Sequence, residues 1–265
     1  MDAAPSLGRR PAVASRAWHE VFLDEESAGL TPSAALALAE GHSVLVQPLA
    51  SAEECELLRA AASASACELR QSLKSPSHET ATPTPAWDPY YRRVRMPVAE
   101  MLDAEQTALC ERLLQRSLSL LPAGAVERLF SPHEPTRIMG NPELTFATGE
   151  PAINVYSEGG SFRPHEDNEA ITILLTLSDA DSFGGGGTGF WSTRDLEGAS
   201  REAAVATAGG LTRFAKKIEP TLVLQPPAGS ALCFSGRITH AGQKVETGER
   251  CVFVASFSPR RESPG

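Results

Sequence analysis

The chain has 265 residues, of which 42% are hydrophobic and 22% charged, and its formal net charge is −9. This globular composition excludes collagen-like rods, coiled-coil rods and wholesale disorder. Nucleic-acid binders usually carry a basic footprint, so the acidic balance argues against that class of partner. The 21 glycines and 20 prolines favour a turn-rich, mainly β fold over a helix bundle.

The N-terminal part of the chain predicts a tail, a helix and a strand. Residues 1–30 show no sustained hydrophobic period, so we expect a loosely ordered tail. Residues 31–40 predict a short helix with Thr31 as its N-cap and a proline at the first helical position. The apolar stretch 43–47 predicts a strand.

Two longer helices follow, separated by a loop. Ser51 begins the first helix, because Glu54 three residues later completes a capping box. The Pro-rich, polar residues 76–97 predict a long loop. Residues 102–120 predict the second helix, because their leucines recur at helical spacing.

The pattern changes near residue 140 from helical spacing to short apolar segments. Clusters of Gly, Pro, Asp or Ser separate these segments, which lie at 152–156, 171–177, 188–191, 221–225, 230–234 and 251–257. Short strands at such intervals are typical of a β-sandwich or β-barrel.

The cysteines and terminal segments indicate the compartment. Five cysteines without a C-x-x-C pair argue against a disulfide scaffold or a Cys-rich zinc site. Cys55 and Cys67 lie on one predicted helix, roughly 18 Å apart at 1.5 Å per residue, too far to bond. No apolar run reaches membrane-spanning length, and no secretory core is present. We therefore expect a cytoplasmic protein, with organelle targeting by the basic N-terminal tail as the alternative.

A His-x-Asp motif carries the candidate metal chemistry. In an extended chain His165 and Asp167 point the same way, while Glu166 points elsewhere. His240, which follows the apolar run ALCF, offers a third ligand from a distant strand. Two imidazoles and one carboxylate form the facial triad of non-heme Fe(II) oxygenases. Zinc is the alternative metal, because hydrolases also use such ligands.

Arg250 is the candidate anion receptor. It begins the apolar stretch CVFVASF, and the polar residues between His240 and Arg250 predict a hairpin that brings Arg250 into the cavity. By the two-residue period of a strand, Val252, Val254 and Ser256 share its face. A buried arginine needs an anionic partner, and its guanidinium fork suits a carboxylate.

Four segments together resemble the catalytic domain of the 2-oxoglutarate- and Fe(II)-dependent dioxygenases, most closely the prolyl 4-hydroxylase and lysyl hydroxylase branch. They occur in the family's order between residues 152 and 257, as INVYSEGGSFRPHED, ITILLTLSD, FGGGGTGFW and PPAGSALCFSGRITHAGQKVETGERCVFVASF. The glycine run lacks the Gly-Lys-Ser/Thr of a P-loop, so it indicates a tight turn close to the site.

The resemblance implies an α+β, mainly β fold: a double-stranded β-helix, or jelly-roll, with N-terminal helices packed on it. We expect one domain with a tail at 1–30, a helical support region at 31–130, the dioxygenase core at 131–259 and a tail at 260–265. The resemblance also implies the site residues, namely His165, Asp167 and His240 as iron ligands, Arg250 for the distal carboxylate of 2-oxoglutarate, Tyr156 as a hydroxyl donor to it, and Thr176 and Asn154 as further pocket residues.

The implied activity is hydroxylation of a C–H bond with release of succinate and CO2. Fe(II), 2-oxoglutarate and O2 are the expected cofactor and co-substrates, with ascorbate as the expected reductant. A peptide, at prolyl or lysyl residues, or a small molecule is the expected substrate. Two alternatives stay open: a nucleic-acid demethylase, because Asn154-Val-Tyr156 is similar to that branch, and a jelly-roll binding module without turnover.

Two loops are candidates for selecting the substrate. The loop at 76–97 holds Trp87, Tyr90 and Tyr91 beside several arginines, and the loop at 193–217 contains Arg194. Long loops often act as lids and carry specificity. The alternative is that both are solvated connections whose aromatic residues pack on the helices.

Overall fold

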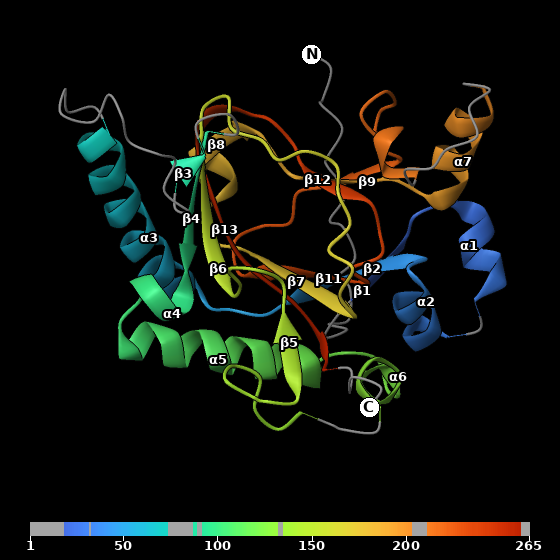
Figure 1. Cartoon of the computed structure of the whole chain (residues 1–265), viewed down its shortest axis with the longest axis horizontal. Coiled ribbons are helices and arrows are strands. Elements are labelled where there is room, and N and C mark those ends of the chain that lie inside the picture. The colour runs from blue at the N-terminus through green and yellow to red at the C-terminus, as the bar shows by residue number, and fades with distance from the viewer. Residues whose placement is uncertain are drawn as a thin grey trace, which may run out of the picture.

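The computed structural model describes residues 19–31, 33–73, 87–88, 92–131, 135–202 and 211–260. Two antiparallel sheets form its centre (Figure 1). The strands of the larger sheet are β1 (His19–Phe22), β2 (Ser43–Pro48), β3 (Trp87–Asp88), β4 (Arg93–Pro97), β5 (Leu144–Phe146), β6 (Ala152–Ser157), β7 (Ile171–Thr176), β8 (Phe183–Gly185), β11 (Ser230–Phe234) and β13 (Val245–Pro259). The smaller sheet holds β9 (Thr188–Phe190), β10 (Leu222–Leu224) and β12 (His240–Gly242).

The order of the strands is that of a double-stranded β-helix. The larger sheet runs β1-β2-β11-β7-β13-β6-β4-β3, with β5 and β8 also pairing with β13, and the smaller runs β10-β9-β12. Along the chain, β7 is followed in the smaller sheet by β9 and β10, β11 returns to the larger sheet, and β12 and β13 repeat the change. Because the chain winds between two facing sheets, the jelly-roll prediction is confirmed.

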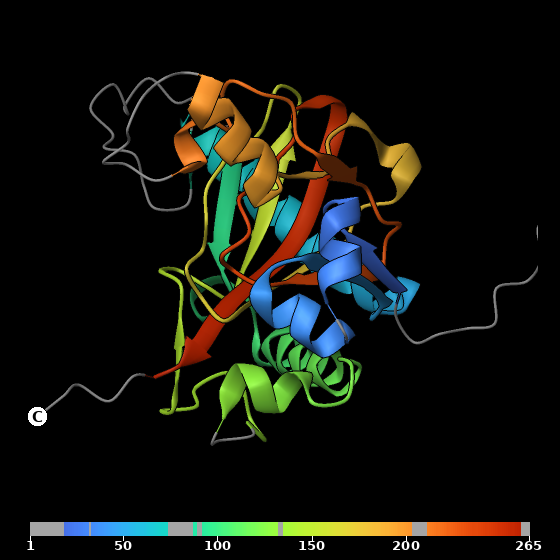
Figure 2. The same ribbon diagram turned by 90° about the vertical axis from the view of Figure 1, so that its right-hand side faces the viewer.

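Helices cover the outer face of the larger sheet. They are α2 (Ala34–Glu40), α3 (Ala52–Leu73), α4 (Val98–Met101), α5 (Ala104–Ser119) and α6 (Ala125–Phe130). Of the other two helices, α1 (Glu25–Leu30) contacts β1, and α7 (Thr193–Glu202) packs beside Ala241 of β12 in the smaller sheet. Leu58 of α3 and Leu113 of α5 are fully buried in one cluster with the outward residues Ile153, Leu175 and Phe253. In Figures 1 and 2, α3 and α5 flank the sheet that the long β13 crosses. The helical front therefore shares its core with the β-rich back.

The inner faces of the two sheets form a second apolar cluster. Leu174 and Val252 from the larger sheet meet Phe190 and Leu222 from the smaller one. Tyr156 belongs to this cluster as well. The alternation of strand side chains thus divides the core into a helix-facing layer and a layer inside the barrel, next to which the polar site lies.

All six strands expected after residue 140 are present, and the capping box is confirmed. The Ser51 amide donates to Glu54 Oε2 at 2.9 Å, and the Glu54 amide donates to Ser51 Oγ at 3.2 Å. The helix predicted at 102–120 is present as a helix from Ala104 to Ser119, which begins after its N-cap Asp103. Cys55 and Cys67 both lie on α3, and none of the five cysteines forms a disulfide.

The predicted start of the 31–40 helix was wrong. Ser33 is the N-cap of α2 and accepts a hydrogen bond from the Leu36 amide, while the Thr31 hydroxyl donates to the Ser27 carbonyl and closes α1. Ordered elements also precede it, since β1 and α1 lie within the predicted tail. Residues 1–18 of that tail lie outside the described part of the chain.

Both predicted loops contain regular structure. Residues 93–97 of the first form β4, which pairs with β6, and α7 occupies the start of the second. The predicted hairpin between His240 and Arg250 was wrong, because β12 pairs with β9 whereas β13 joins the larger sheet. Within the described residues, no helix is long and apolar enough to cross a membrane.

Candidate metal centre

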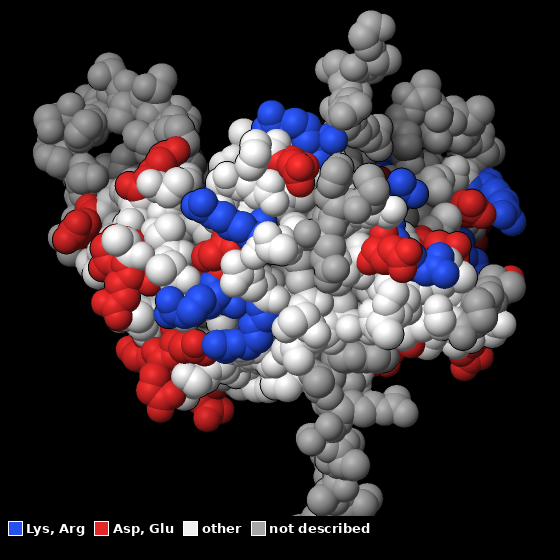
Figure 3. All heavy atoms as spheres, turned by 90° about the horizontal axis from the view of Figure 1, so that it is seen from below, with Lys and Arg blue, Asp and Glu red and all other residues white. Residues whose placement is uncertain are grey.

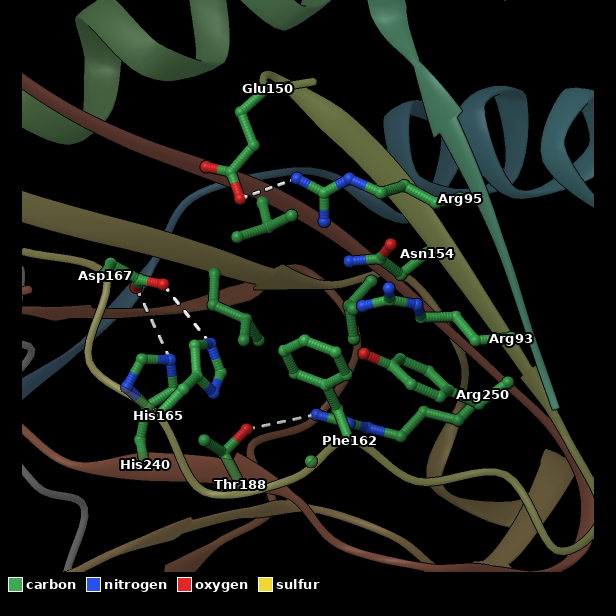
Figure 4. A pocket seen from close by; sticks show the side chains of 15 residues that line it. Arg93, Arg95, Glu150, Asn154, Phe162, His165, Asp167, Thr188, His240 and Arg250 are labelled. Atoms are coloured by element: carbon green, nitrogen blue, oxygen red, sulfur yellow. Dashed lines mark hydrogen bonds and ion pairs between the residues drawn. The ribbon is translucent and has the colours of Figure 1, made fainter. Parts of the chain in front are cut away.

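A backbone bridge brings the three predicted ligands together. The His165 amide donates to the His240 carbonyl at 3.0 Å, and the His240 amide donates back to His165 at 2.9 Å. This pairing places the two imidazoles side by side, with ring centroids 4.3 Å apart. Asp167 follows on the same segment, and one ligand atom from each of the three residues lies within 4.8 Å of the others. Figure 4 shows both rings turned toward the carboxylate.

The hydrogen bonds of the two rings fix which nitrogens face the carboxylate. Nδ1 of His165 lies 2.9 Å from the Arg163 carbonyl, and Nδ1 of His240 lies 2.9 Å from the Ile238 carbonyl. A carbonyl only accepts, so each Nδ1 carries the hydrogen and each Nε2 presents a lone pair. These Nε2 atoms lie 3.2 and 3.4 Å from the oxygens of Asp167. A cation among these atoms would satisfy all three side chains, so the residues fit a metal with nitrogen and oxygen ligands.

The surroundings keep the ligands in the forms that bind a metal. Burial alone raises the pKa of Asp167, but the two imidazoles and the Thr172 hydroxyl, 2.6 Å from Oδ2, together hold it well below its usual range. Burial lowers the pKa of His240 to about 4, so its imidazole is neutral near pH 7. An ionised carboxylate and a neutral imidazole are the ligand forms that Fe(II) needs.

Glu166, between the two ligands of the motif, points away from them as predicted. Its Oε1 accepts hydrogen bonds from the hydroxyls of Thr212 at 2.9 Å and Thr239 at 3.1 Å. Glu166 therefore links the segment of His165 and Asp167 to Thr212, which follows α7, and to Thr239, which precedes His240.

Arg250 lies in the same pocket as the ligands. It is only 3% exposed, and it lines the cavity together with Val252 and Val254, as the strand period predicted. Its guanidinium donates to the Thr188 hydroxyl at 3.2 Å and stands 5.8 Å from the centroid of the Tyr156 ring. No carboxylate among the described residues pairs with it, and burial lowers its pKa. Arg250 thus fits an external carboxylate.

The cavity is small, and the candidate metal ligands and Arg250 lie in its wall. Asn154 and Tyr156 line it as expected. Thr176 is buried on β7 but is not among the lining residues. Thr172 lies four residues earlier, on the same face of β7 as Thr176. Its hydroxyl donates to Asp167. Sequence reasoning also missed Thr188, whose hydroxyl bonds Arg250.

Residues 151–257 match the family model of the 2OG-Fe(II) oxygenase superfamily. The match covers about two fifths of the chain. The superfamily consists of oxidoreductases that use Fe(II) and 2-oxoglutarate, and the matched segment contains all three candidate ligands and Arg250. No curated protein matches the chain.

Solved structures of oxygenases are similar at low identity. HygX from Streptomyces hygroscopicus, with nickel, 2-oxoglutarate and hygromycin B bound, is 16% identical over 82% of each chain, with a TM-score of 0.47. A Pseudomonas putida prolyl-4-hydroxylase is 17% identical over 86% of this chain and 98% of its own, with a TM-score of 0.44. A 2OG-Fe(II) oxygenase family protein from Burkholderia pseudomallei is 18% identical, and this chain spans less than half of it, 43%, with a TM-score of 0.29.

Of the residues predicted to contact substrate, Arg194 lies outside the pocket that holds the candidate metal ligands. Arg194 is exposed on α7, where it forms a 3.0 Å ion pair with Glu26 and lines a separate hollow between α1 and α7. Trp87 lies in the edge strand β3, and Tyr90 and Tyr91 lie outside the described residues. Arg93 and Phe162, which were not predicted as site residues, do line the pocket.

Proposed function

We propose that this protein is an Fe(II)- and 2-oxoglutarate-dependent dioxygenase that hydroxylates a C–H bond and releases succinate and CO2. The observation that carries the proposal is the convergence of His165, Asp167 and His240 with the buried Arg250 in one cavity. The substrate is a peptidyl prolyl or lysyl residue or a small molecule. The four segments that resemble the prolyl 4-hydroxylase and lysyl hydroxylase branch support this choice.

In this proposal each side chain has one task. His165, Asp167 and His240 would hold Fe(II), which with 2-oxoglutarate and O2 supplies the oxidation that yields succinate, CO2 and the hydroxylated carbon. Arg250 binds the distal carboxylate of 2-oxoglutarate. The Thr188 hydroxyl accepts a hydrogen bond from its guanidinium, and the Tyr156 ring lies 5.8 Å from it. Leu174, Val252 and Val254 line the cavity with apolar groups that exclude water.

Succinate release from 2-oxoglutarate tests whether the chain is an enzyme. With Fe(II) and ascorbate, the wild-type protein is expected to release succinate slowly even without a substrate. Asp167→Ala removes the only carboxylate ligand, so its release is expected to fall to the level of free Fe(II). Equal, negligible release from both proteins would favour a binding module without turnover. Full activity without added ascorbate would leave that reductant with no role.

Metal stoichiometry tests the third ligand separately from activity. His240→Ala leaves one imidazole and one carboxylate, so its bound Fe(II), measured anaerobically, is expected to fall well below one per chain. Iron bound at full stoichiometry would contradict the assignment of His240. Arg194→Ala, which changes an exposed residue of a separate hollow, is the control and is expected to bind iron normally.

A mass-spectrometric screen for an added oxygen atom identifies the class of substrate. Prolyl and lysyl peptides, small metabolites and methylated oligonucleotides make up the panel. We expect no product from the oligonucleotides, because the net charge is −9 and the face in Figure 3 shows acidic and basic groups interspersed, without a basic stripe. Demethylated oligonucleotide would move the protein to the alternative branch.

A further inference from the structure

The oxygenase pocket contains a second buried arginine that the proposed chemistry does not use. Arg93 of β4 is 9% exposed and lines the cavity, and its Nε is buried without a hydrogen-bond partner in the described part of the chain. Its guanidinium carbon lies 4.2 Å from the centroid of the Phe162 ring. No carboxylate of the described residues pairs with Arg93. A buried charge in this state is costly unless a ligand pairs with it.

An unpaired acceptor lies next to this unpaired donor. Oδ1 of Asn154 is buried without a hydrogen-bond partner within the described residues, and the side chain is 4% exposed. Arg93 is paired in register with Tyr156, and Arg95 with Asn154, so all four side chains share the face of the sheet that lines the pocket. Figure 4 shows Arg93 beside Asn154. A ligand that fills this corner must accept from Arg93 and donate to Asn154.

The corner is separate from the place of Arg250. Arg250 and Val252 of β13 pair with Tyr156 and Asn154 from one side of β6, whereas β4 pairs with β6 from the other side. Arg93 therefore lies across the intervening strand from Arg250. The Phe162 ring contacts the Arg93 guanidinium and also lies 4.6 Å from the ring of His165. The Phe162 ring thus lies between Arg93 and the metal ligand His165.

The charges of the pocket leave Arg93 alone without a counterion. Arg95 forms an ion pair with Glu150 at 2.9 Å, so it already has a counterion. Fe(II) with Asp167, and 2-oxoglutarate with Arg250, form a set whose formal charges cancel. The charge on Arg93 remains, and a single negative charge on the substrate would balance it.

We propose that Arg93 and Asn154 form the substrate anchor of this oxygenase, with Arg93 binding a carboxylate and Asn154 accepting a hydrogen bond from a neutral N–H or O–H next to it. The substrate class is a small monocarboxylate such as an N-acylated amino acid, and the carbon that is oxidised lies away from the carboxylate, beyond the Phe162 ring. This inference rests on the proposed function, because it takes the metal and Arg250 as the sites of iron and 2-oxoglutarate. The guanidinium fork and the limited cavity volume favour a carboxylate on a small molecule.

Calorimetry on the full chain loaded with Ni(II) and 2-oxoglutarate tests the anchor without turnover. The probes are N-acetyl-L-alanine, N-acetyl-L-leucine and N-acetyl-L-lysine, each beside its primary amide, which matches it in size but lacks the charge. At least one acid is expected to bind, and its amide roughly 10- to 100-fold more weakly, as for loss of a charge-assisted hydrogen bond. In Arg93→Gln the acid is expected to bind no better than the amide.

Two further variants keep the test independent of folding. Arg93→Lys keeps the charge but loses the fork, so it is expected to retain part of the preference for the acid. Arg92→Gln is the matched control, because Arg92 is exposed and donates to the Glu158 carbonyl outside the pocket, and it is expected to retain the full preference.

The outcomes separate this inference from the function on which it rests. If the wild-type protein binds 2-oxoglutarate but none of the acids, or if Arg93→Gln keeps the acid preference, the anchor is wrong while the oxygenase proposal stands. If Arg93→Gln weakens 2-oxoglutarate itself tenfold or more, Arg93 belongs to the co-substrate site and the inference is overturned. If the wild type binds no 2-oxoglutarate with Ni(II), the proposed function fails first.

Discussion

At the scale of single residues, Arg250 is the residue that we propose binds 2-oxoglutarate. Arg250→Gln removes the charge that a buried carboxylate needs, so the KM for 2-oxoglutarate is expected to rise at least tenfold, since a hydrogen bond to a charged group contributes about 1.5–3 kcal/mol. Arg250→Lys is expected to lie between this variant and the wild type, because it lacks the fork. Succinate release at varied 2-oxoglutarate measures both.

The control for this prediction is the metal. Arg250 contacts Thr188 and the Tyr156 ring, and no metal ligand is among its hydrogen-bond partners, so both variants are expected to bind Fe(II) like the wild type. An unchanged KM in Arg250→Gln would show that another group holds the co-substrate. Arg93, the other unpaired cation of the pocket, would then be the next to test.

The three proposed metal ligands could be predicted to lie together because their geometry is mostly local. A spacing of two in extended chain already places His165 and Asp167 on one side, and the apolar run before His240 indicates a strand end. Arg93 could not be predicted as a site residue, because its position depends on the pairing of β4 with β6. That pairing joins segments separated by α4, α5, α6 and β5, and no local pattern specifies it.

At the scale of elements, a substitution in the glycine run beside Arg250 is expected to affect the pocket. Gly186 has φ of +73°, and a Cβ there would lie 2.9 Å from Phe183 Cε2 and 3.2 Å from Arg250 Cδ. Gly186→Ala is therefore expected to lower the free energy of unfolding by about 1–2 kcal/mol. It is also expected to raise the KM for 2-oxoglutarate by displacing Arg250.

Gly198 provides the matched control for this substitution. It lies in α7, and a Cβ there meets nothing within 4 Å, so Gly198→Ala is expected to be neutral or to stabilise the protein by up to about 1 kcal/mol. Urea unfolding and succinate release are measured for both variants. Equal stability and equal KM in Gly186→Ala would show that this turn does not constrain Arg250.

Features of the elements that have a local sequence signal could be predicted, whereas features that depend on distant segments could not. Period-two patterns and turn residues gave the positions of the six core strands, but the partner of each strand is a non-local property. The hairpin predicted before Arg250 failed for that reason, since β12 and β13 lie in opposite sheets. In β4 the alternation was present: Val94 and Met96 join the helix-facing core while Arg93 and Arg95 face the pocket. The surrounding Pro-rich composition concealed it.

At the scale of the whole molecule, the helices and the jelly-roll share one apolar core. Phe257 of β13 is fully buried, and its ring lies 5.5 Å from that of Phe130 in α6 and 5.2 Å from that of Phe146 in β5. The same cluster contains Leu113 of α5 and Leu58 of α3. Because neither part buries its apolar face alone, we predict a single domain that unfolds in one step.

Phe257→Ala tests this prediction from the β-rich side. Removing a fully buried phenylalanine is expected to cost about 3–5 kcal/mol. If the molecule is one cooperative unit, far-UV circular dichroism, dominated by the helices, and tryptophan fluorescence, to which the buried Trp191 contributes, shift to the same lower urea midpoint. Two separated transitions, with the helical signal unmoved, would mean that the front folds by itself. The jelly-roll would then be a domain of its own, and the helices an attached one.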